Sequence, residues 1–316
     1  MLIVGIILGL IISLNILGLI INTVFFKDEL QSIKPYGEMV DVNGSKMHVY
    51  SMGNGEETIV LLPGFGIPLP SADFGPLMRK LSEKYTVVIV EYFGVGFSEE
   101  VDTHRTNENY TNEIRVSLKQ SGFKPPYILM PHSSSGIYSE YYAAKNPEEI
   151  SSIIMLDTTS TDRVEKTPGY INIIYSVAKM QQATGFMRLT SKLAPETKLI
   201  ENGYTEKERE DYKKFLSHTI NDTMIDQSLR LMDNVKEVKK LTFPEDIPVL
   251  KIISKQAIEK IGKKDKDNGM GYQNEHLNRL GENVSFEVLD ATHFVYQTKV
   301  DEIMALTNQF ITKNKN

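Results

Sequence analysis

The 316-residue sequence contains no cysteine. This absence excludes disulfide bonds, thiol nucleophiles and cysteine metal sites. The sequence also lacks any cluster of lysine and arginine with interleaved aromatic residues, and its formal net charge at pH 7 is −6. Nucleic acid is therefore not an expected partner of this chain.

Two signals that would indicate a bound cofactor are missing as well. No pair of histidines, and no histidine–aspartate pair, has a spacing typical of a metal site. Gly94 and Gly96 form a Gly-x-Gly pattern, but no helix is expected to start directly on it, so it is not the fingerprint of a dinucleotide-binding loop. We therefore expect neither a metal nor an organic cofactor.

Charged side chains are absent from residues 1–26, where isoleucine, leucine, valine and glycine dominate. At 1.5 Å per residue, a helix of this length would span a bilayer core of roughly 30 Å. The end of the stretch has no small-x-small cleavage pattern. The sequence thus predicts an uncleaved single-pass transmembrane anchor at 1–26, with the membrane as a partner and as the location, followed by a tether at 27–37. Lys27 and Lys34 bias the orientation only slightly toward a cytoplasmic domain, so the side of the membrane stays open.

Removing the first segment leaves about 290 residues, enough for one large domain with a sizeable core. Alternating apolar runs around Asn43-Gly44 predict a hairpin at 39–50. Beyond it, strand-like runs alternate with helical patterns, which predicts an α/β fold with a parallel sheet and right-handed crossovers. Between about 159 and 245 helical patterns follow one another without a strong strand. The strand-like runs are 58–62, 86–90, 127–130, 151–156, 248–254 and 284–289.

One stretch has the local order that a catalytic serine needs. Residues 127–130 are strand-like, Ser133 to Gly136 are small, and a helical pattern then runs to Pro147. A sharp turn between strand and helix projects one side chain outward, and the first N–H groups of the helix favour negative charge at the same place. The pattern predicts a nucleophile elbow.

This stretch resembles the elbow of the α/β-hydrolase superfamily, which often reads Gly-His-Ser-x-Gly-Gly before a helix that closes with Tyr-Ala and a proline. Residues 131–136 read Pro-His-Ser-Ser-Ser-Gly, and Tyr-Ala follows at 142–143 with Pro147 beyond. The resemblance implies a mostly parallel eight-stranded sheet flanked by helices over 38–316, with a helical cap inserted after the sixth strand at about 159–245. In membrane-anchored bacterial-type members of this superfamily, an N-terminal segment precedes such a domain.

Two registers of the elbow are open. In the first, Ser133 is the nucleophile and Ser135 replaces the glycine two positions later. In the second, Ser134 is the nucleophile, Gly136 lies two positions later, and the bulky His132 precedes it by two. We favour Ser133, because this register aligns His132, Gly136 and Pro147 with the superfamily pattern together.

The resemblance also implies the partners of the nucleophile. His293 follows the last expected strand, at the place of the superfamily's catalytic base. The acid is usually an aspartate after the seventh strand, where Asp265 is the nearest one, but some lipases carry it after the sixth strand, where this chain has Asp157. We favour Asp157, because a strand end holds a side chain more rigidly than a long charged loop.

The oxyanion hole is expected from backbone N–H groups. In the superfamily, one donor follows a His-Gly pair after the third strand; Pro63-Gly64 stands there, so the donor is Phe65. The second donor is the residue after the nucleophile, Ser134. Together these residues predict a serine hydrolase with an acyl-enzyme mechanism, acting by default on small-molecule carboxylic esters of apolar character. Peptidase and C–C hydrolase chemistry use the same machinery, and a non-catalytic receptor or scaffold with this fold is the alternative from another class.

Overall fold

The computed structural model describes residues 2–162, 167–193, 195–262 and 269–315. Within them, eight strands form one sheet in the order β1-β2-β4-β3-β5-β6-β7-β8. Strands β1, β2 and β4 pair antiparallel, and all other neighbours pair parallel. The strands are β1 (Glu38–Val42), β2 (Ser45–Met52), β3 (Thr58–Leu62), β4 (Thr86–Val90), β5 (Tyr127–Pro131), β6 (Ile150–Leu156), β7 (Val249–Ser254) and β8 (Val284–Leu289).

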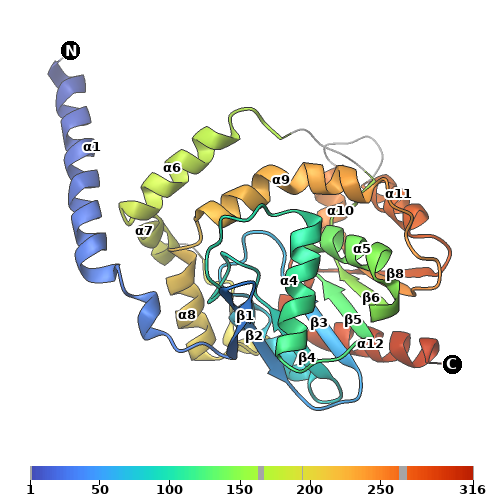
Figure 1. Cartoon of the computed structure of the whole chain (residues 1–316). Coiled ribbons are helices and arrows are strands. Elements are labelled where there is room, and N and C mark those ends of the chain that lie inside the picture. Colours follow the sequence, from blue (N-terminus) through green and yellow to red (C-terminus); the bar gives the residue numbers. More distant parts are fainter. Residues whose placement is uncertain (1, 163–166, 194, 263–268, 316) are drawn as a thin grey trace.

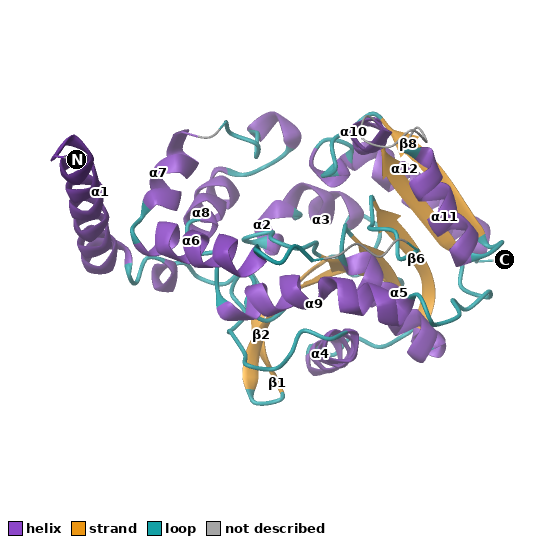
Figure 2. Cartoon of the chain, turned by 90° about the horizontal axis from the view of Figure 1, so that it is seen from above, coloured by secondary structure: helices purple, strands orange, loops and turns teal. Residues whose placement is uncertain are grey.

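Helices cover both faces of this sheet, because the central strands are apolar on both sides. Val60 and Leu62 of β3 face a core formed with α4, α5 and α9, whereas Ile59 and Leu61 face a second core formed with α3 and α12. The two layers of helices on either side of the strands are visible in Figure 2. The helices that belong to the sheet are α2 (Pro70–Asp73), α3 (Gly75–Leu81), α4 (Asn107–Gln120), α5 (Ser135–Lys145), α10 (Lys255–Gly262), α11 (Met270–Leu280) and α12 (Val300–Asn314).

In the described residues between β6 and β7, four further α-helices form the cap. They are α6 (Ile171–Ala183), α7 (Phe186–Leu193), α8 (Glu206–Leu216) and α9 (Asp222–Val238). The prediction of an α/β-hydrolase fold, with an eight-stranded mostly parallel sheet and a helical cap after the sixth strand, is therefore confirmed. The sequence predicts a long charged loop over 255–271, after the seventh strand, but this region begins with the helix α10, whose Ile258 is buried.

The predicted membrane anchor at 1–26 is wrong. In the parts of the chain that the structure describes, no helix has both the length and the apolar character needed to cross a membrane. Neither the membrane location nor the membrane partner is therefore supported. Helix α1 (Leu2–Ile21) continues into a π-helical turn at Asn22–Phe26, and Figure 1 shows α6 and α7 near this end of α1.

Polar and aromatic contacts join this turn to the cap. The Asn22 amide lies 3.4 Å from the carbonyl oxygen of Gln182 and donates to that of Ala183 at 3.2 Å. The guanidinium of Arg188, on α7, lies over the Phe26 ring at 4.1 Å. The end of the segment that the sequence assigns to lipid thus contacts protein.

Glu29, which follows this turn, forms an ion pair with α7 of the cap. Arg188 donates to both of its carboxylate oxygens, at 2.9 and 2.5 Å, and both side chains are largely shielded from solvent. His218, just after α8, lies 3.3 Å from the same carboxylate. Neither α6 nor α7 has a buried residue, so these contacts add to the polar contacts that hold the two helices, such as the hydrogen bond from Tyr175 to Ser228.

This arrangement makes a prediction about the cap. Changing Glu29→Gln removes the charge from the paired carboxylate and should weaken docking of α7 by about 1.5 kcal/mol, the lower end of the contribution of a hydrogen bond to a charged group. Amide hydrogen exchange in residues 186–193 should then become roughly tenfold faster. Glu38→Gln, an exposed change on β1, is the matched control and should leave this exchange unchanged. Equal exchange in both variants would contradict the link.

Candidate active site

The carboxyl ends of the parallel strands bring the predicted residues to one edge of the sheet. Ser133 follows β5, Asp157 follows β6 and His293 follows β8. The pairing of β5 and β6 continues past the strands as a bridge between His132 and Leu156. Residues more than a hundred positions apart in sequence therefore meet without any long flexible connection.

Ser133 occupies a strained turn. Its φ of 53° lies in the left-handed region that non-glycine residues rarely adopt, and α5 starts two residues later. Two glycines make room for it: a Cβ on Gly64 would lie 2.8 Å from the Cβ of Ser133, and one on Gly136 would lie 2.6 Å from the Cβ of Thr158. The turn is thus built as a nucleophile elbow requires.

His293 bridges the serine and the aspartate. Its Nε2 lies 2.9 Å from the Oγ of Ser133, and its Nδ1 lies 2.6 Å from Oδ2 of Asp157. A carboxylate can only accept a hydrogen bond, so Nδ1 carries the proton and Nε2 is left to accept from the serine hydroxyl. This is the direction of proton transfer that activates a serine.

Asp157 is fixed from two sides. It is 4% exposed, and its second carboxylate oxygen accepts the N–H of Ser254 at 2.9 Å. Its own N–H donates to the carbonyl of Ile252 at 2.7 Å, and its φ is 45°. Of the two acids that the sequence leaves open, the structure therefore brings Asp157 to His293, whereas Asp265 lies outside the described residues.

The two predicted oxyanion donors lie on facing segments. The N–H of Ser134 has no hydrogen-bond acceptor among the described residues. The N–H of Phe65 donates to the Oγ of Ser134 at 2.9 Å. Both backbone groups therefore flank the elbow, but one of them is engaged by a side chain.

The sequence did not predict what Ser135 does. Its hydroxyl donates to the carbonyl of Pro63 at 2.5 Å and lies 2.9 Å from the hydroxyl of Tyr92. Since Ser135 donates to Pro63, the hydroxyl of Tyr92 donates to Ser135. The only signal in the sequence is a small polar residue where the superfamily usually has glycine, and the structure uses it to join the elbow to the loop after β3.

The sequence also did not predict the contact between His132 and His293. The Nε2 of His132 lies 3.1 Å from the backbone carbonyl of His293, so it carries a proton and donates. Its Nδ1 is buried and has no partner in the described part of the chain. Burial, assisted by the nearby His293, lowers the pKa of His132 from its ordinary 6.5 to about 3. His132 is therefore neutral near pH 7 and holds the His293 loop.

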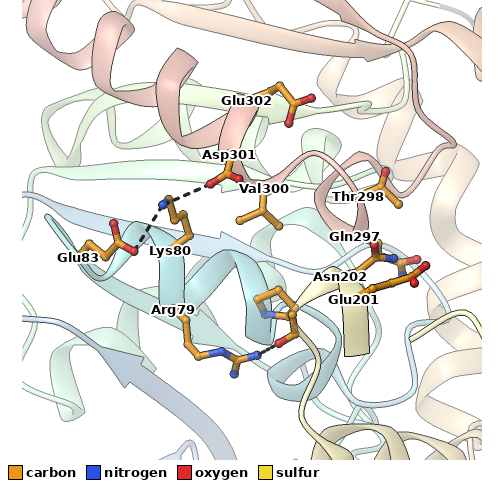
Figure 3. A pocket seen from close by; sticks show the side chains of 12 residues that line it. Arg79, Lys80, Glu83, Glu201, Asn202, Gln297, Thr298, Val300, Asp301 and Glu302 are labelled. Carbon is orange, nitrogen blue, oxygen red and sulfur yellow. Dashed lines mark hydrogen bonds and ion pairs between the residues drawn. The ribbon is translucent and has the colours of Figure 1, made fainter. Parts of the chain in front are cut away.

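The described part of the chain offers no metal site, and its pocket near α3 and α12 does not contain the serine, histidine and aspartate described above. No group of three or more carboxylate or histidine side chains in it could hold a metal ion. Figure 3 shows a surface pocket of about 380 Å³ that contains neither Ser133, Asp157 nor His293. Its lysine, Lys80, is already paired with Glu83 at 3.5 Å and Asp301 at 3.2 Å.

Comparison with known proteins agrees with this architecture. Residues 57–181 match the family described as alpha/beta hydrolase fold. The chain is 29% identical over 293 residues to YbdG of Bacillus subtilis, covering 90% of this chain and 88% of YbdG. It is 30% identical over 120 residues to the human serine hydrolase BPHL, covering 37% of this chain and 40% of BPHL.

Solved structures show the same fold. The epoxide hydrolase VrEH1 from Vigna radiata superposes with a TM-score of 0.63 at 18% identity, covering 90% of this chain and 99% of that one. At this identity the similarity shows the fold, and the family match covers the segment 57–181.

The buried, neutral His132 leads to a prediction about pH. In the unfolded chain it binds a proton below about pH 6.5, but in the folded protein only near pH 3, so the free energy of unfolding falls as pH drops through this window. Gln at this position keeps an N–H donor and does not titrate. Between pH 7 and pH 5 the wild type should lose about 2 kcal/mol more than His132→Gln, as measured by urea unfolding. An equal loss in the two proteins would mean that His132 is already protonated in the folded state at pH 5.

Proposed function

We propose that this chain is a serine hydrolase that acts through an acyl-enzyme on small-molecule carboxylic esters. The observation that supports this most directly is the continuous hydrogen-bonded chain from Ser133 through His293 to Asp157, with separations of 2.9 and 2.6 Å. The similarity to hydrolases, one of them named a serine hydrolase, supports the same reaction class.

In the first half of the reaction, the Oγ of Ser133 attacks the ester carbonyl carbon while Nε2 of His293 takes the hydroxyl proton. Asp157 stabilises the imidazolium that results. The negative charge on the former carbonyl oxygen is stabilised by the N–H groups of Phe65 and Ser134, each worth roughly 3 kcal/mol in comparable sites. The intermediate collapses when His293 protonates the leaving alcohol, which departs.

In the second half, water attacks the acyl-enzyme. His293 removes a proton from this water and then returns it to the Oγ of Ser133, so the carboxylic acid is released and the enzyme is regenerated. The apolar side of the substrate is expected near Phe294. Its ring is 38% exposed and lies 5.4 Å from the ring of His293.

The nucleophile is tested by labelling with a fluorophosphonate probe. Wild-type protein should react covalently and Ser133→Ala should not, because only a serine with a base at hydrogen-bond distance is activated. A folded wild-type protein that remains unlabelled would instead favour the non-catalytic receptor or scaffold. Turnover of p-nitrophenyl esters of increasing acyl length, compared with that of amide substrates, separates esterase from peptidase activity.

The acid is tested by three amide substitutions. Asp157→Asn should lower ester turnover by about four orders of magnitude, because the amide cannot stabilise the imidazolium and favours the wrong tautomer of His293. Asp265→Asn should retain turnover, as should the control Asp290→Asn, an exposed aspartate three residues before His293. Circular dichroism checks that all three fold. A large loss in Asp265→Asn alone would make Asp265 the acid in place of Asp157.

A further inference from the structure

The hydroxyl of Ser134 lies where the proposed reaction needs an empty position. Its Oγ accepts the N–H of Phe65 at 2.9 Å, and the residue is 3% exposed. An effective oxyanion donor lies 2.7–3.1 Å from the charged oxygen. The Oγ of Ser134 therefore lies as far from the N–H of Phe65 as the substrate oxygen would have to lie.

This bond is not needed to cap α5. Ser134 is the N-cap residue of the helix, where a serine side chain commonly accepts an N–H from the first turn. Here it makes no such bond and turns instead toward Phe65. Removing the hydroxyl should consequently leave the start of the helix intact.

Nor is the bond needed to hold the loop after β3. Ser135 already joins this loop to the elbow through the carbonyl of Pro63, and Tyr92 supports that hydroxyl from behind. Gly64 fixes how closely the two segments approach. Contacts of Ser135 thus position the loop without Ser134. The contact described for the Ser134 hydroxyl is the hydrogen bond that it accepts from the N–H of Phe65.

We propose that the Ser134 hydroxyl is an internal occupant of the oxyanion hole, which the substrate oxygen displaces as it binds. This inference rests on the proposed function, since it assumes that the N–H of Phe65 is an oxyanion donor. A single rotation about χ1 moves Oγ to another staggered position and frees that N–H. Catalysis then begins with the loss of one internal hydrogen bond, and the site at rest is closed to weak acceptors.

The test compares Ser134→Ala with wild type. The variant should raise kcat/KM for a p-nitrophenyl ester roughly five-fold, which corresponds to the net strength of one neutral hydrogen bond. It should raise affinity for phenylboronic acid, which mimics the tetrahedral intermediate, by a similar factor. Ser134→Gly should behave in the same way, because glycine also serves at an N-cap. Ser139→Ala, a fully buried serine on the same helix, is the matched control and should change neither quantity.

The outcomes separate this inference from the proposed function. If Ser134→Ala is labelled by the fluorophosphonate but its kcat/KM falls, the hydroxyl donates to the oxyanion, and the inference is overturned. Unchanged kcat/KM and boronate affinity overturn it too. If instead the wild type is not labelled, the proposed function fails. If Ser134→Ala abolishes labelling and Ser133→Ala does not, Ser134 is the nucleophile. The assignment of Ser133 as nucleophile and this inference then both fail.

Discussion

The close approach of two backbone segments is the constraint on which the site depends. The loop after β3 and the turn after β5 meet at Gly64, where a Cβ would overlap both the Cβ of Ser133 and Nδ1 of His132. Parallel pairing of β3 with β5 sets this approach, since Leu62 pairs with Pro131 at the very end of both strands. In the proposed reaction, stabilisation of the carbonyl oxygen depends on how closely these two segments approach.

Each of three consecutive serines makes a different hydrogen-bond contact where these segments meet. Ser133 faces His293, Ser134 faces the N–H of Phe65, and Ser135 faces the carbonyl of Pro63. A hydroxyl can accept and donate, so adjacent serines can satisfy a donor and an acceptor on the same opposing loop. The three serines at 133–135 thus each match a polar group that lies opposite them.

Much of the fold could be predicted because it depends on local signals. Alternating and continuous apolar runs mark the strands, and the Asn43-Gly44 turn gives the register of β1 with β2, where Val42 pairs with Ser45. The positions of Ser133, Asp157 and His293 could be predicted for a related reason. Each follows the end of a strand, and parallel strands end at one edge.

The remaining features depend on tertiary contacts that no local pattern records. The partner of His132 is the backbone of His293, 161 positions away, and the direction of the Ser134 hydroxyl is a rotamer set by the opposing loop. The anchor prediction for residues 1–26 is wrong, because apolar composition does not reveal that Asn22 and Phe26 contact α6 and α7. Likewise, α10 was missed because its polar residues conceal the buried Ile258.

The positive φ angles of Ser133 and Asp157 lower the stability of the fold. Each left-handed residue costs about 1–3 kcal/mol relative to a relaxed backbone, and glycine would relieve that strain. The edge of the sheet that carries the proposed catalytic residues is therefore also an edge where the backbone is strained. If these residues act as proposed, replacing either by glycine would stabilise the fold and abolish turnover, so stability and activity would oppose each other at these two positions.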